Sequence, residues 1–178
     1  MKIMIASDLH GSAYYAEKLL NKFAEEECEK LILLGDIYNH GPRNPLPEGY
    51  APMRVAELLN AEREKLIVIK GNCDSEVDTM ISSFDFIDDV CLISGGKTIF
   101  LTHGHVYNKD AMPKTAFDAV IYGHFHIGFV VRDGGTVVAN AGSVSLPKNG
   151  TPRSYLVLDE NILTLKDMDG NIISKTVI

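Results

Sequence analysis

The chain has 178 residues, of which 46% are hydrophobic and 23% charged, a composition typical of a globular domain. We therefore expect a single domain over residues 1–178, large enough to bury its core without a disulfide or a structural metal. The 17 Lys and Arg are outnumbered by 24 Asp and Glu, and no run of five or six like charges occurs. This balance argues against a nucleic-acid partner, because binding to a nucleic-acid backbone needs concentrated positive charge.

Five short apolar runs, rich in β-branched residues, predict buried strands. They lie at Lys2–Ser7, Lys30–Leu34, Leu66–Lys70, Thr98–Thr102 and Ala119–Tyr122. Apolar residues at helical spacing predict two helices between the first three strands, Ala13–Glu27 with Ser12 as its N-cap, and Pro52–Arg63. The chain therefore begins as a βαβαβ unit, and ligands are expected beyond the carboxyl ends of its strands.

Turn signals dominate the chain after Phe86, where the helical period largely disappears. They lie at Ser94–Gly96, Asp133–Gly135, Asp159–Asn161 and Asp169–Gly170. We expect this half to form hairpins, so the predicted fold class is α/β, with two packed mixed β-sheets flanked by helices. One long irregular stretch, Asp36–Ala51, is expected to be either functional or disordered.

No segment predicts export or membrane insertion. The apolar run Ile3–Ala6 is too short for the core of a signal peptide, and no later run reaches the length of a membrane span. The cysteines, Cys28, Cys73 and Cys91, are odd in number and form no CxxC pair, which argues against a disulfide framework and a thiolate zinc site. We expect a cytoplasmic protein without membrane association.

Polar side chains that can bind metal follow all five predicted strands. They are Asp8, His10, Asp36, Asn72, His103, His124 and His126. If the strand ends converge, two carboxylates, one amide oxygen and four imidazoles share one pocket, which is more than a zinc ion requires. Such a set suits two metal ions about 3.5–4 Å apart that share a bridging carboxylate.

Each of these residues alone has a plainer explanation, because a single Asp or His after a strand is more often a turn former or a solvated loop residue. However, all six histidines of the chain fall in loops after predicted strands, and none falls in a predicted helix. The glycines before Asp36, Asn72 and His124 fit tight turns at strand ends, with or without metal. The combined pattern favours a metal site.

The motifs SDLHG, GDIYNHG, GNCD, THGH and YGHFH, in this order between residues 7 and 126, resemble those of the calcineurin-like metallophosphoesterase family. The strings NHGPRNPLPEGYAP and GNCDSEVD are similar, more narrowly, to the small bacterial YfcE-type phosphodiesterases. The resemblance implies a four-layer α/β/β/α sandwich and a metal-dependent phosphodiesterase that hydrolyses small phosphodiesters.

The resemblance also implies two ligand sets that share Asp36. Asp8, His10, Asp36 and His126 would hold one ion, and Asp36, Asn72, His103 and His124 the other. Nitrogen and oxygen donors without thiolate suit Mn²⁺, Fe, Zn²⁺ or Ni²⁺, and the resemblance favours Mn²⁺. A hydroxide that bridges the two metals would attack phosphorus, while the metals neutralise charge on the phosphoryl oxygens.

The predicted catalytic residues are Asn72, Cys73 and Asp74, and one of them departs from the family. Many relatives have His after Gly-Asn as the general acid, whereas a cysteine is a weak donor with an ordinary pKa of about 8.5. Cys73 is equally well explained as a small buried apolar residue. Asp74 is expected to orient a ligand or to begin a helix.

His40, Arg43 and His105 are the candidate substrate-binding residues. Arg43 is suited to hold phosphate oxygens with its forked guanidinium, and its alternative role is a solvated loop charge. The two histidines could instead orient neighbouring ligands through hydrogen bonds.

Two other functions fit the same resemblance. One is a phosphomonoesterase or protein phosphatase of the same fold, against which Cys73 in place of His counts mildly. The other is a non-catalytic interaction scaffold like the retromer small subunit, which need not keep the metal ligands that are all present here. The expected partner is a small phosphate-ester substrate, and the chain could be a monomer or a homo-oligomer.

Overall fold

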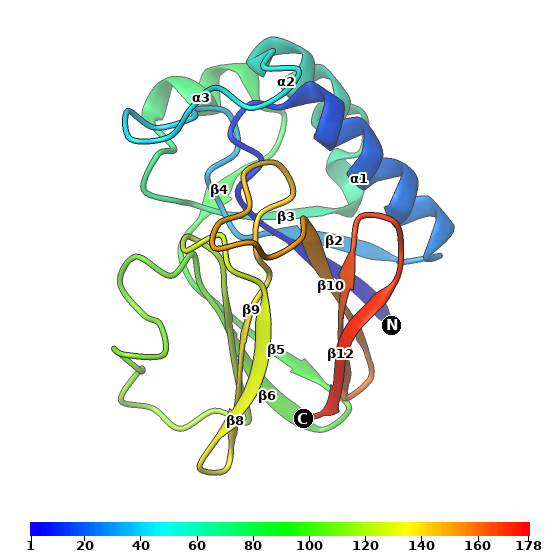
Figure 1. Ribbon diagram of the computed structural model, residues 1–178, viewed down its shortest axis with the longest axis vertical. Coiled ribbons are helices and arrows are strands. Elements are labelled where there is room, and N and C mark those ends of the chain that lie inside the picture. Colours follow the sequence, from blue (N-terminus) through cyan, green and yellow to red (C-terminus); the bar gives the residue numbers. More distant parts are fainter.

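The computed structural model describes all 178 residues and is drawn in Figure 1. Its elements are β1 (Lys2–Ala6), α1 (Ala13–Glu25), β2 (Lys30–Leu33), α2 (Pro52–Ala61), a 3-10 turn (Arg63–Lys65), β3 (Leu66–Ile69), α3 (Glu76–Ile81), β4 (Phe86–Ile87), β5 (Val90–Ser94), β6 (Lys97–Leu101), β7 (Ala119–Tyr122), β8 (Phe129–Asp133), β9 (Thr136–Asn140), β10 (Ser154–Asp159), β11 (Ile162–Asp167) and β12 (Ile172–Val177). The predicted strands and helices of the first 122 residues are all present, with ends that differ by at most two residues.

Two mixed sheets form the centre of the molecule. The seven-stranded sheet has the order β12-β11-β10-β1-β2-β3-β4, and its strands β1 to β4 are parallel. The five-stranded sheet has the order β5-β6-β7-β9-β8, and its strands β6, β7 and β9 are parallel. The four predicted turns close the hairpins β5–β6, β8–β9, β10–β11 and β11–β12, which are all antiparallel.

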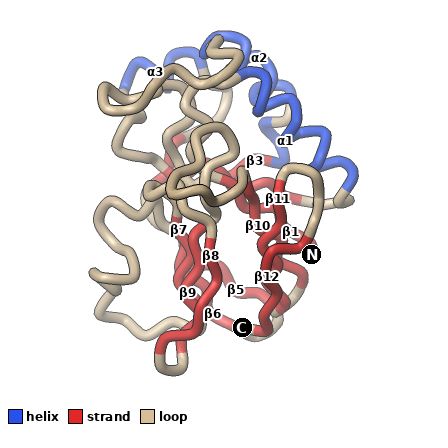
Figure 2. Tube along the Cα trace, viewed as in Figure 1, coloured by secondary structure: helices blue, strands red, loops and turns tan.

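The side chains of β1 alternate between two cores, as a strand buried on both faces requires. Ile3 and Ile5 join the core between the sheets, whereas Met4 and Ala6 pack with the helices. Helix α1 begins at its predicted N-cap, because the Ser12 hydroxyl accepts a hydrogen bond from the Tyr15 amide at 3.2 Å. The helices cover the outer face of the seven-stranded sheet (Figure 2).

The outer face of the five-stranded sheet is covered differently. Its buried side chains, Val120, Tyr122 and Val138, pack with aromatic residues that include Phe117 in the connection from β6 to β7. Residues 102–118 of that connection contain no helix and follow the outer side of this sheet (Figure 1). The α/β class with two packed mixed sheets is therefore confirmed. A loop covers the outer face of the five-stranded sheet, where the predicted four-layer sandwich has a second layer of helices. None of the helices is long and apolar enough to span a membrane.

Candidate metal centre

The seven predicted ligands come together where the carboxyl ends of parallel strands from both sheets meet. Strands β1, β2 and β3 deliver the first four, Asp8, His10, Asp36 and Asn72. Strands β6 and β7 of the other sheet deliver His103, His124 and His126. The ligands were expected at one sheet edge. They lie instead where the two sheets meet, so the site depends on how the sheets pack against each other.

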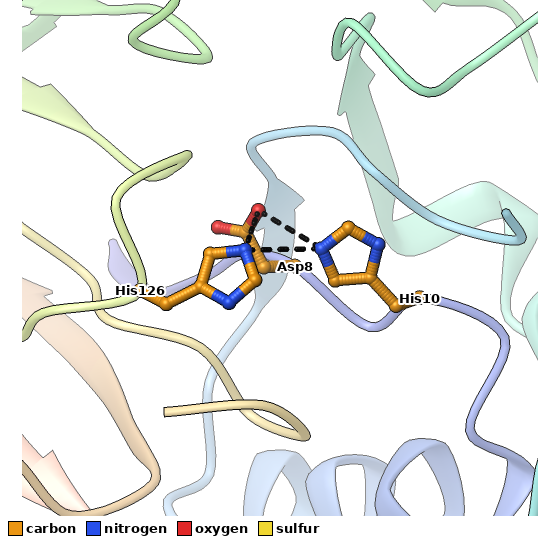
Figure 3. Close-up of side chains that lie close together, drawn as sticks. All are labelled: Asp8, His10 and His126. Atoms are coloured by element: carbon orange, nitrogen blue, oxygen red, sulfur yellow. Dashed lines mark hydrogen bonds and ion pairs between the residues drawn. The ribbon is translucent and has the colours of Figure 1, made fainter. Parts of the chain in front are cut away.

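The Asp8, His10 and His126 side chains form a compact group (Figure 3). The Nε2 atoms of the two histidines are 3.1 Å apart, and they lie 3.5 and 3.3 Å from Asp8 Oδ1. All three residues are buried, with at most 2% of their surface exposed. This geometry leaves three donor atoms around one point inside the protein.

A second group lies beside the first and is linked to it by Asp36. Asp36 Oδ2 is 3.7 Å from His10 Nε2, and its Oδ1 is 3.5 Å from His103 Nε2. His103 Nε2 also lies 3.0 Å from Asn72 Oδ1 and 3.2 Å from His124 Nδ1. Asp36 therefore faces both groups, as a shared ligand must.

Backbone carbonyls fix the tautomers of three histidines. The Nδ1 atoms of His10, His103 and His126 donate to the carbonyl oxygens of Asn39, Leu34 and Leu146, at 2.7, 2.7 and 2.6 Å. A carbonyl can only accept, so the hydrogen of each neutral ring is on Nδ1 and the lone pair is on Nε2. Three lone pairs thus point into the cluster, the arrangement by which proteins orient histidine ligands of metals.

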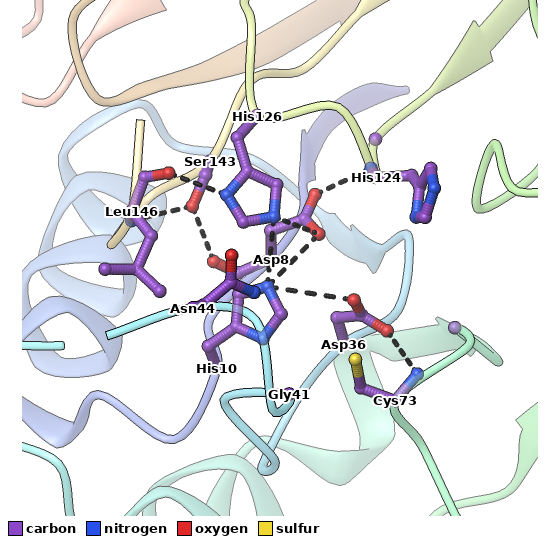
Figure 4. Close-up of polar contacts among 12 residues, drawn as sticks. Asp8, His10, Asp36, Gly41, Asn44, Cys73, His124, His126, Ser143 and Leu146 are labelled. Atoms are coloured by element: carbon purple, nitrogen blue, oxygen red, sulfur yellow. Dashed lines mark hydrogen bonds and ion pairs between the residues drawn. The ribbon is translucent and has the colours of Figure 1, made fainter. Parts of the chain in front are cut away.

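The buried carboxylate of Asp8 has one oxygen that no group of the protein satisfies with a hydrogen bond. Its Oδ2 accepts from the His124 amide at 2.9 Å (Figure 4). Its Oδ1 has no hydrogen-bond partner and lies near the Nε2 atoms of His10 and His126. Burial opposes ionisation, but the neighbouring His10 and His126 rings hold the pKa of Asp8 well below its usual range. Burial alone would lower the pKa of His10, yet Asp8 raises it overall. The donor set therefore fits a divalent cation, which would satisfy the orphaned oxygen and the facing lone pairs.

His124 is suited to a neutral ligand role. Burial, assisted by the neighbouring His103 ring, lowers the pKa of His124 to about 4, so its imidazole is uncharged at neutral pH. A neutral imidazole keeps a lone pair for a metal.

The backbone is strained at the ligands. Eight residues other than glycine have positive φ, and five of them are predicted ligands, namely Asp8, His10, Asp36, His124 and His126. Such conformations persist only where the surrounding structure enforces them, and they cluster at functional sites.

Two of the motif glycines serve close packing more than turn geometry. A Cβ on Gly71 would lie 2.3 Å from Asp36 Oδ1, and one on Gly123 would lie 1.9 Å from the Ser7 hydroxyl. Any side chain there would push the two strand ends apart. The glycines therefore allow the ligands to approach one another.

The Asp74 carboxylate clamps the loops after β2 and β3. It accepts three backbone hydrogen bonds, from Asp36 and Gly71 with Oδ2 at 2.8 and 2.7 Å, and from Ile37 with Oδ1 at 2.8 Å. Burial raises the pKa of Asp74 to about 6, although these donors oppose the shift. Asp74 thus positions Asp36 and does not reach the pocket.

Cys73 lies between the ligands and the pocket. Its amide donates to Asp36 Oδ1 at 2.8 Å, and its sulfur accepts from the Asn72 side-chain amide at 3.4 Å. Burial, followed by the charge of Asp36, raises the pKa of the Cys73 thiol to about 12. Its sulfur also lies within 4.8 Å of ligand atoms of His10 and Asp36.

A pocket of about 740 Å³ opens beside the cluster. It is lined by Asp36, Asn39, Gly41, Pro42, Arg43, Asn44, Asn72, Cys73, His124, Phe125, His126 and Lys148. Of the three predicted substrate-binding residues, only Arg43 is part of this lining. His40 packs edge-on against Tyr50 at 5.5 Å between ring centres, and the ring of His105 lies 5.4 Å from that of His103, outside the pocket wall.

Several pocket residues were not identified from the sequence. Asn39 and Asn44 lie in the long loop that was expected to be either functional or disordered, and nothing distinguished them from its other polar residues. Phe125 stands between two histidines of a motif and could have been found there. Lys148 lies in the sequence Lys-Asn-Gly, which looks like an ordinary turn.

Two serines support Asp8 from behind. The hydroxyls of Ser143 and Ser145 donate to the Asp8 carbonyl oxygen at 2.7 and 2.9 Å. Asn140 donates to the Gly123 carbonyl oxygen at 2.7 Å. Asn140, Ser143 and Ser145 therefore fix the ligand-bearing backbone and are not part of the pocket lining.

Comparisons with known proteins agree with this geometry. The profile of the calcineurin-like phosphoesterase superfamily domain matches residues 1–161. The chain is 44% identical over 183 residues to phosphodiesterase YfcE of Escherichia coli K12, covering 100% of this chain and 98% of YfcE. It is 29% identical to the probable metallophosphoesterase YsnB of Bacillus subtilis, covering 96% of this chain and 94% of YsnB.

Solved structures with the same fold also match this chain. A structure of the E. coli phosphoesterase YfcE superposes with a TM-score of 0.95 at 43% identity, covering 100% of both chains. Vps29 of Entamoeba histolytica in complex with Zn²⁺ superposes with a TM-score of 0.64 at 17% identity, covering 99% of both chains. The second match, at this low identity, indicates a shared fold alone.

Proposed function

Because the chain belongs to the calcineurin-like phosphoesterase superfamily, we propose that it is a phosphodiesterase that hydrolyses small phosphodiesters with two divalent metal ions. The observation that carries the proposal is the pair of ligand groups joined by Asp36, with facing lone pairs and an orphaned Asp8 oxygen. Further support comes from the 44% identity to phosphodiesterase YfcE over the full length of this chain.

The proposed ligand sets are those expected from the sequence. Asp8, His10, Asp36 and His126 hold one ion, and Asp36, Asn72, His103 and His124 hold the other. When bound, two divalent ions lower the pKa of water between them and neutralise charge on the phosphoryl oxygens. All seven donors are nitrogen or oxygen and none is a thiolate, which suits Mn²⁺, Fe, Zn²⁺ or Ni²⁺, and of these we favour Mn²⁺ on the resemblance to the family.

The residues of the chain itself orient the reaction. Arg43 lines the pocket, and its guanidinium, with five N–H donors, is suited to hold anionic oxygens of the substrate. Asp74 keeps Asp36 in place through the backbone of both loops. Cys73 gives little help in protonating the leaving group, because a thiol is a weak hydrogen-bond donor. The enzyme should therefore prefer substrates with good leaving groups.

The proposal extends to the setting of the enzyme. Residues 1–178 act as one catalytic domain, for which the support is that β10, from the C-terminal part, pairs with β1 beside the site. The three free cysteines are consistent with action in the reducing cytoplasm. A scaffold role without catalysis is less favoured, because a scaffold has no need of the strained ligand backbone.

The test is a substrate panel for purified, Mn²⁺-loaded protein. We expect hydrolysis of aryl phosphodiesters such as bis(4-nitrophenyl) phosphate, slower hydrolysis of 4-nitrophenyl phosphate, and loss of both activities with a chelator. Faster hydrolysis of the monoester would favour the phosphomonoesterase. Full activity after exhaustive chelation would refute a metal-dependent enzyme.

A further inference from the structure

Two cationic side chains, Arg43 and Lys148, line the pocket without any partner in the protein. Each of the other four arginines has one, either a carboxylate or a backbone carbonyl; they are Arg54, Arg63, Arg132 and Arg153. The chain as a whole carries a formal net charge of −7, so these cations do not belong to a generally basic surface. Two free cations at one pocket indicate an anionic ligand.

Arg43 stands on a rigid turn. The Asn39 side chain accepts from the Gly41 amide at 2.8 Å, and the Asn44 amide donates to the Gly41 carbonyl oxygen at 3.2 Å. The turn is fixed to the cluster because His10 donates to the Asn39 carbonyl oxygen at 2.7 Å. The backbone of Arg43 is therefore held relative to a proposed metal ligand.

Lys148 is anchored in a similar way. Its amide donates to the His126 carbonyl oxygen at 3.0 Å, and Thr151 donates to the Lys148 carbonyl oxygen through its amide at 3.1 Å and its hydroxyl at 2.8 Å. His126 is the direct neighbour of His10 in the cluster. The turns that carry the two cations thus hold the two histidines of one pair, and the backbone of both cations is already ordered before a ligand binds.

The reacting phosphate does not need both cations. A phosphodiester carries one negative charge, and the two carboxylates Asp8 and Asp36 do not cancel the charge of two divalent ions. The proposed metal centre can therefore neutralise the phosphodiester by itself. The pocket of about 740 Å³ also has room for a substrate arm that extends well beyond the phosphate.

We propose that Arg43 and Lys148 form an anion subsite that binds a second negatively charged group on the substrate. The inference rests on the proposed phosphodiesterase function and names its substrate class: phosphodiesters with a further phosphate or carboxylate on the ester arm that stays with phosphorus. Phe125, 41% exposed on the same pocket wall, offers an apolar contact for the uncharged part of that arm.

A matched pair of substrates tests the subsite. Both are 4-nitrophenyl esters of thymidine 5′-phosphate, one with a free 3′-hydroxyl and one with a 3′-phosphate, so their leaving groups are identical. Wild-type protein with Mn²⁺ should prefer the phosphorylated ester by about tenfold in kcat/KM, the size of one charge-assisted hydrogen bond. The preference should shrink in Arg43→Ala and Lys148→Ala and vanish in the double variant.

Lys175→Ala is the matched control, because Lys175 is an exposed lysine on β12 that likewise has no ion pair. It should keep the full preference. Equal kcat/KM for the two esters in wild type would overturn the subsite. The same would follow if Arg43→Ala and Lys148→Ala slowed both esters by the same factor, since the cations would then act on the reacting phosphate.

Binding gives a readout that does not depend on turnover. Calorimetry on chelated protein should detect thymidine 3′,5′-bisphosphate binding that weakens with added salt and is lost in the double variant. Binding unchanged in the double variant, or absent in wild type, would refute the subsite. If metal-loaded protein hydrolyses neither ester, the phosphodiesterase proposal fails, and this titration still decides whether the two cations bind an anion.

Discussion

The two ligand groups of the cluster differ in their access to solvent. Asp8 and His10 have no exposed surface, and His126 alone connects their group to the pocket wall. In the other group, Asn72 is exposed and His124 is half-buried, and both line the pocket. The first group is part of the protein core, whereas the second forms part of the surface that meets substrate. We infer that the buried group retains its ion more firmly and that the pocket-facing group exchanges its ion more readily.

The largest effect is expected where the two groups join. Asp36→Asn keeps the shape of the side chain but removes the charge that both groups share, so it should lower kcat/KM by about 10³-fold or more. Elemental analysis should find fewer than two ions per chain at Mn²⁺ concentrations that saturate wild type. If Asp36→Asn keeps activity within tenfold of wild type, Asp36 is not the shared ligand.

Truncating one ligand of each group sharpens the comparison. His10→Ala should leave about one ion per chain and cost about 2 kcal/mol of stability, because it empties space in the core. Asn72→Ala should also leave about one ion but change the free energy of unfolding by no more than about 0.5 kcal/mol, because Asn72 is exposed. Metal analysis and urea denaturation of the chelated variants would measure both quantities. Equal stability losses would contradict the assignment of His10 to the core.

Chelation should separate folding from metal binding. The apolar clusters between the sheets and under the helices include none of the seven proposed ligands, so the chelated protein should keep its circular dichroism spectrum and unfold cooperatively. Its Tm should fall, because ions that bind the native state stabilise it by about 2.7 kcal/mol per site at one hundred times Kd. Chelator titration should release the ions in two steps. Collapse of the spectrum would mean that the ions are structural.

Cys73 should have the smallest effect, although it lies beside the pocket-facing group. Cys73→Ala should leave kcat/KM for aryl phosphodiesters nearly unchanged, and the wild-type rate should depend steeply on leaving-group pKa. Cys73→His should flatten that dependence if the imidazole reaches the leaving oxygen, because general acids contribute about 10²–10⁴-fold. A hundredfold loss in folded, metal-loaded Cys73→Ala would instead make the thiol catalytic.

Strand ends, their metal-binding side chains and the hairpin turns could be predicted from the sequence, because each depends on residues that are close together in the chain. Strand, turn glycine and ligand follow one another within a few positions at Gly35-Asp36 and Gly123-His124, so both the strand end and its donor can be identified locally. The four hairpins were predictable for the same reason, since a glycine or an Asx turn signals each of them.

The pairing of strands that are far apart in the sequence was harder to predict. No local signal indicates that β10 inserts beside β1, or that β6, β7 and β9 form a separate sheet, so the strand ends were expected at one edge and not where two sheets meet. Helix α3 was expected only as the alternative explanation of Asp74, because it has only six residues, although Asp78 accepts from the Ser75 amide at its N-terminus and the Ser-x-x-Asp spacing was readable. Lys148 was missed because its position depends on a contact with His126, 22 residues away in the sequence.

The positive φ angles of five of the proposed ligands imply that conformational stability and metal binding oppose each other at these positions. A left-handed conformation costs a residue with a side chain about 1 kcal/mol or more, and glycine avoids most of that cost. Relief of this strain would therefore favour glycine at the half-buried His124, where the replacement would also remove a donor, whereas at the buried His10 the lost packing would outweigh the relief. Engineered variants that become more thermostable through changes at these strand ends should consequently lose metal affinity in proportion, whereas stabilising changes in the β11–β12 hairpin carry no such cost.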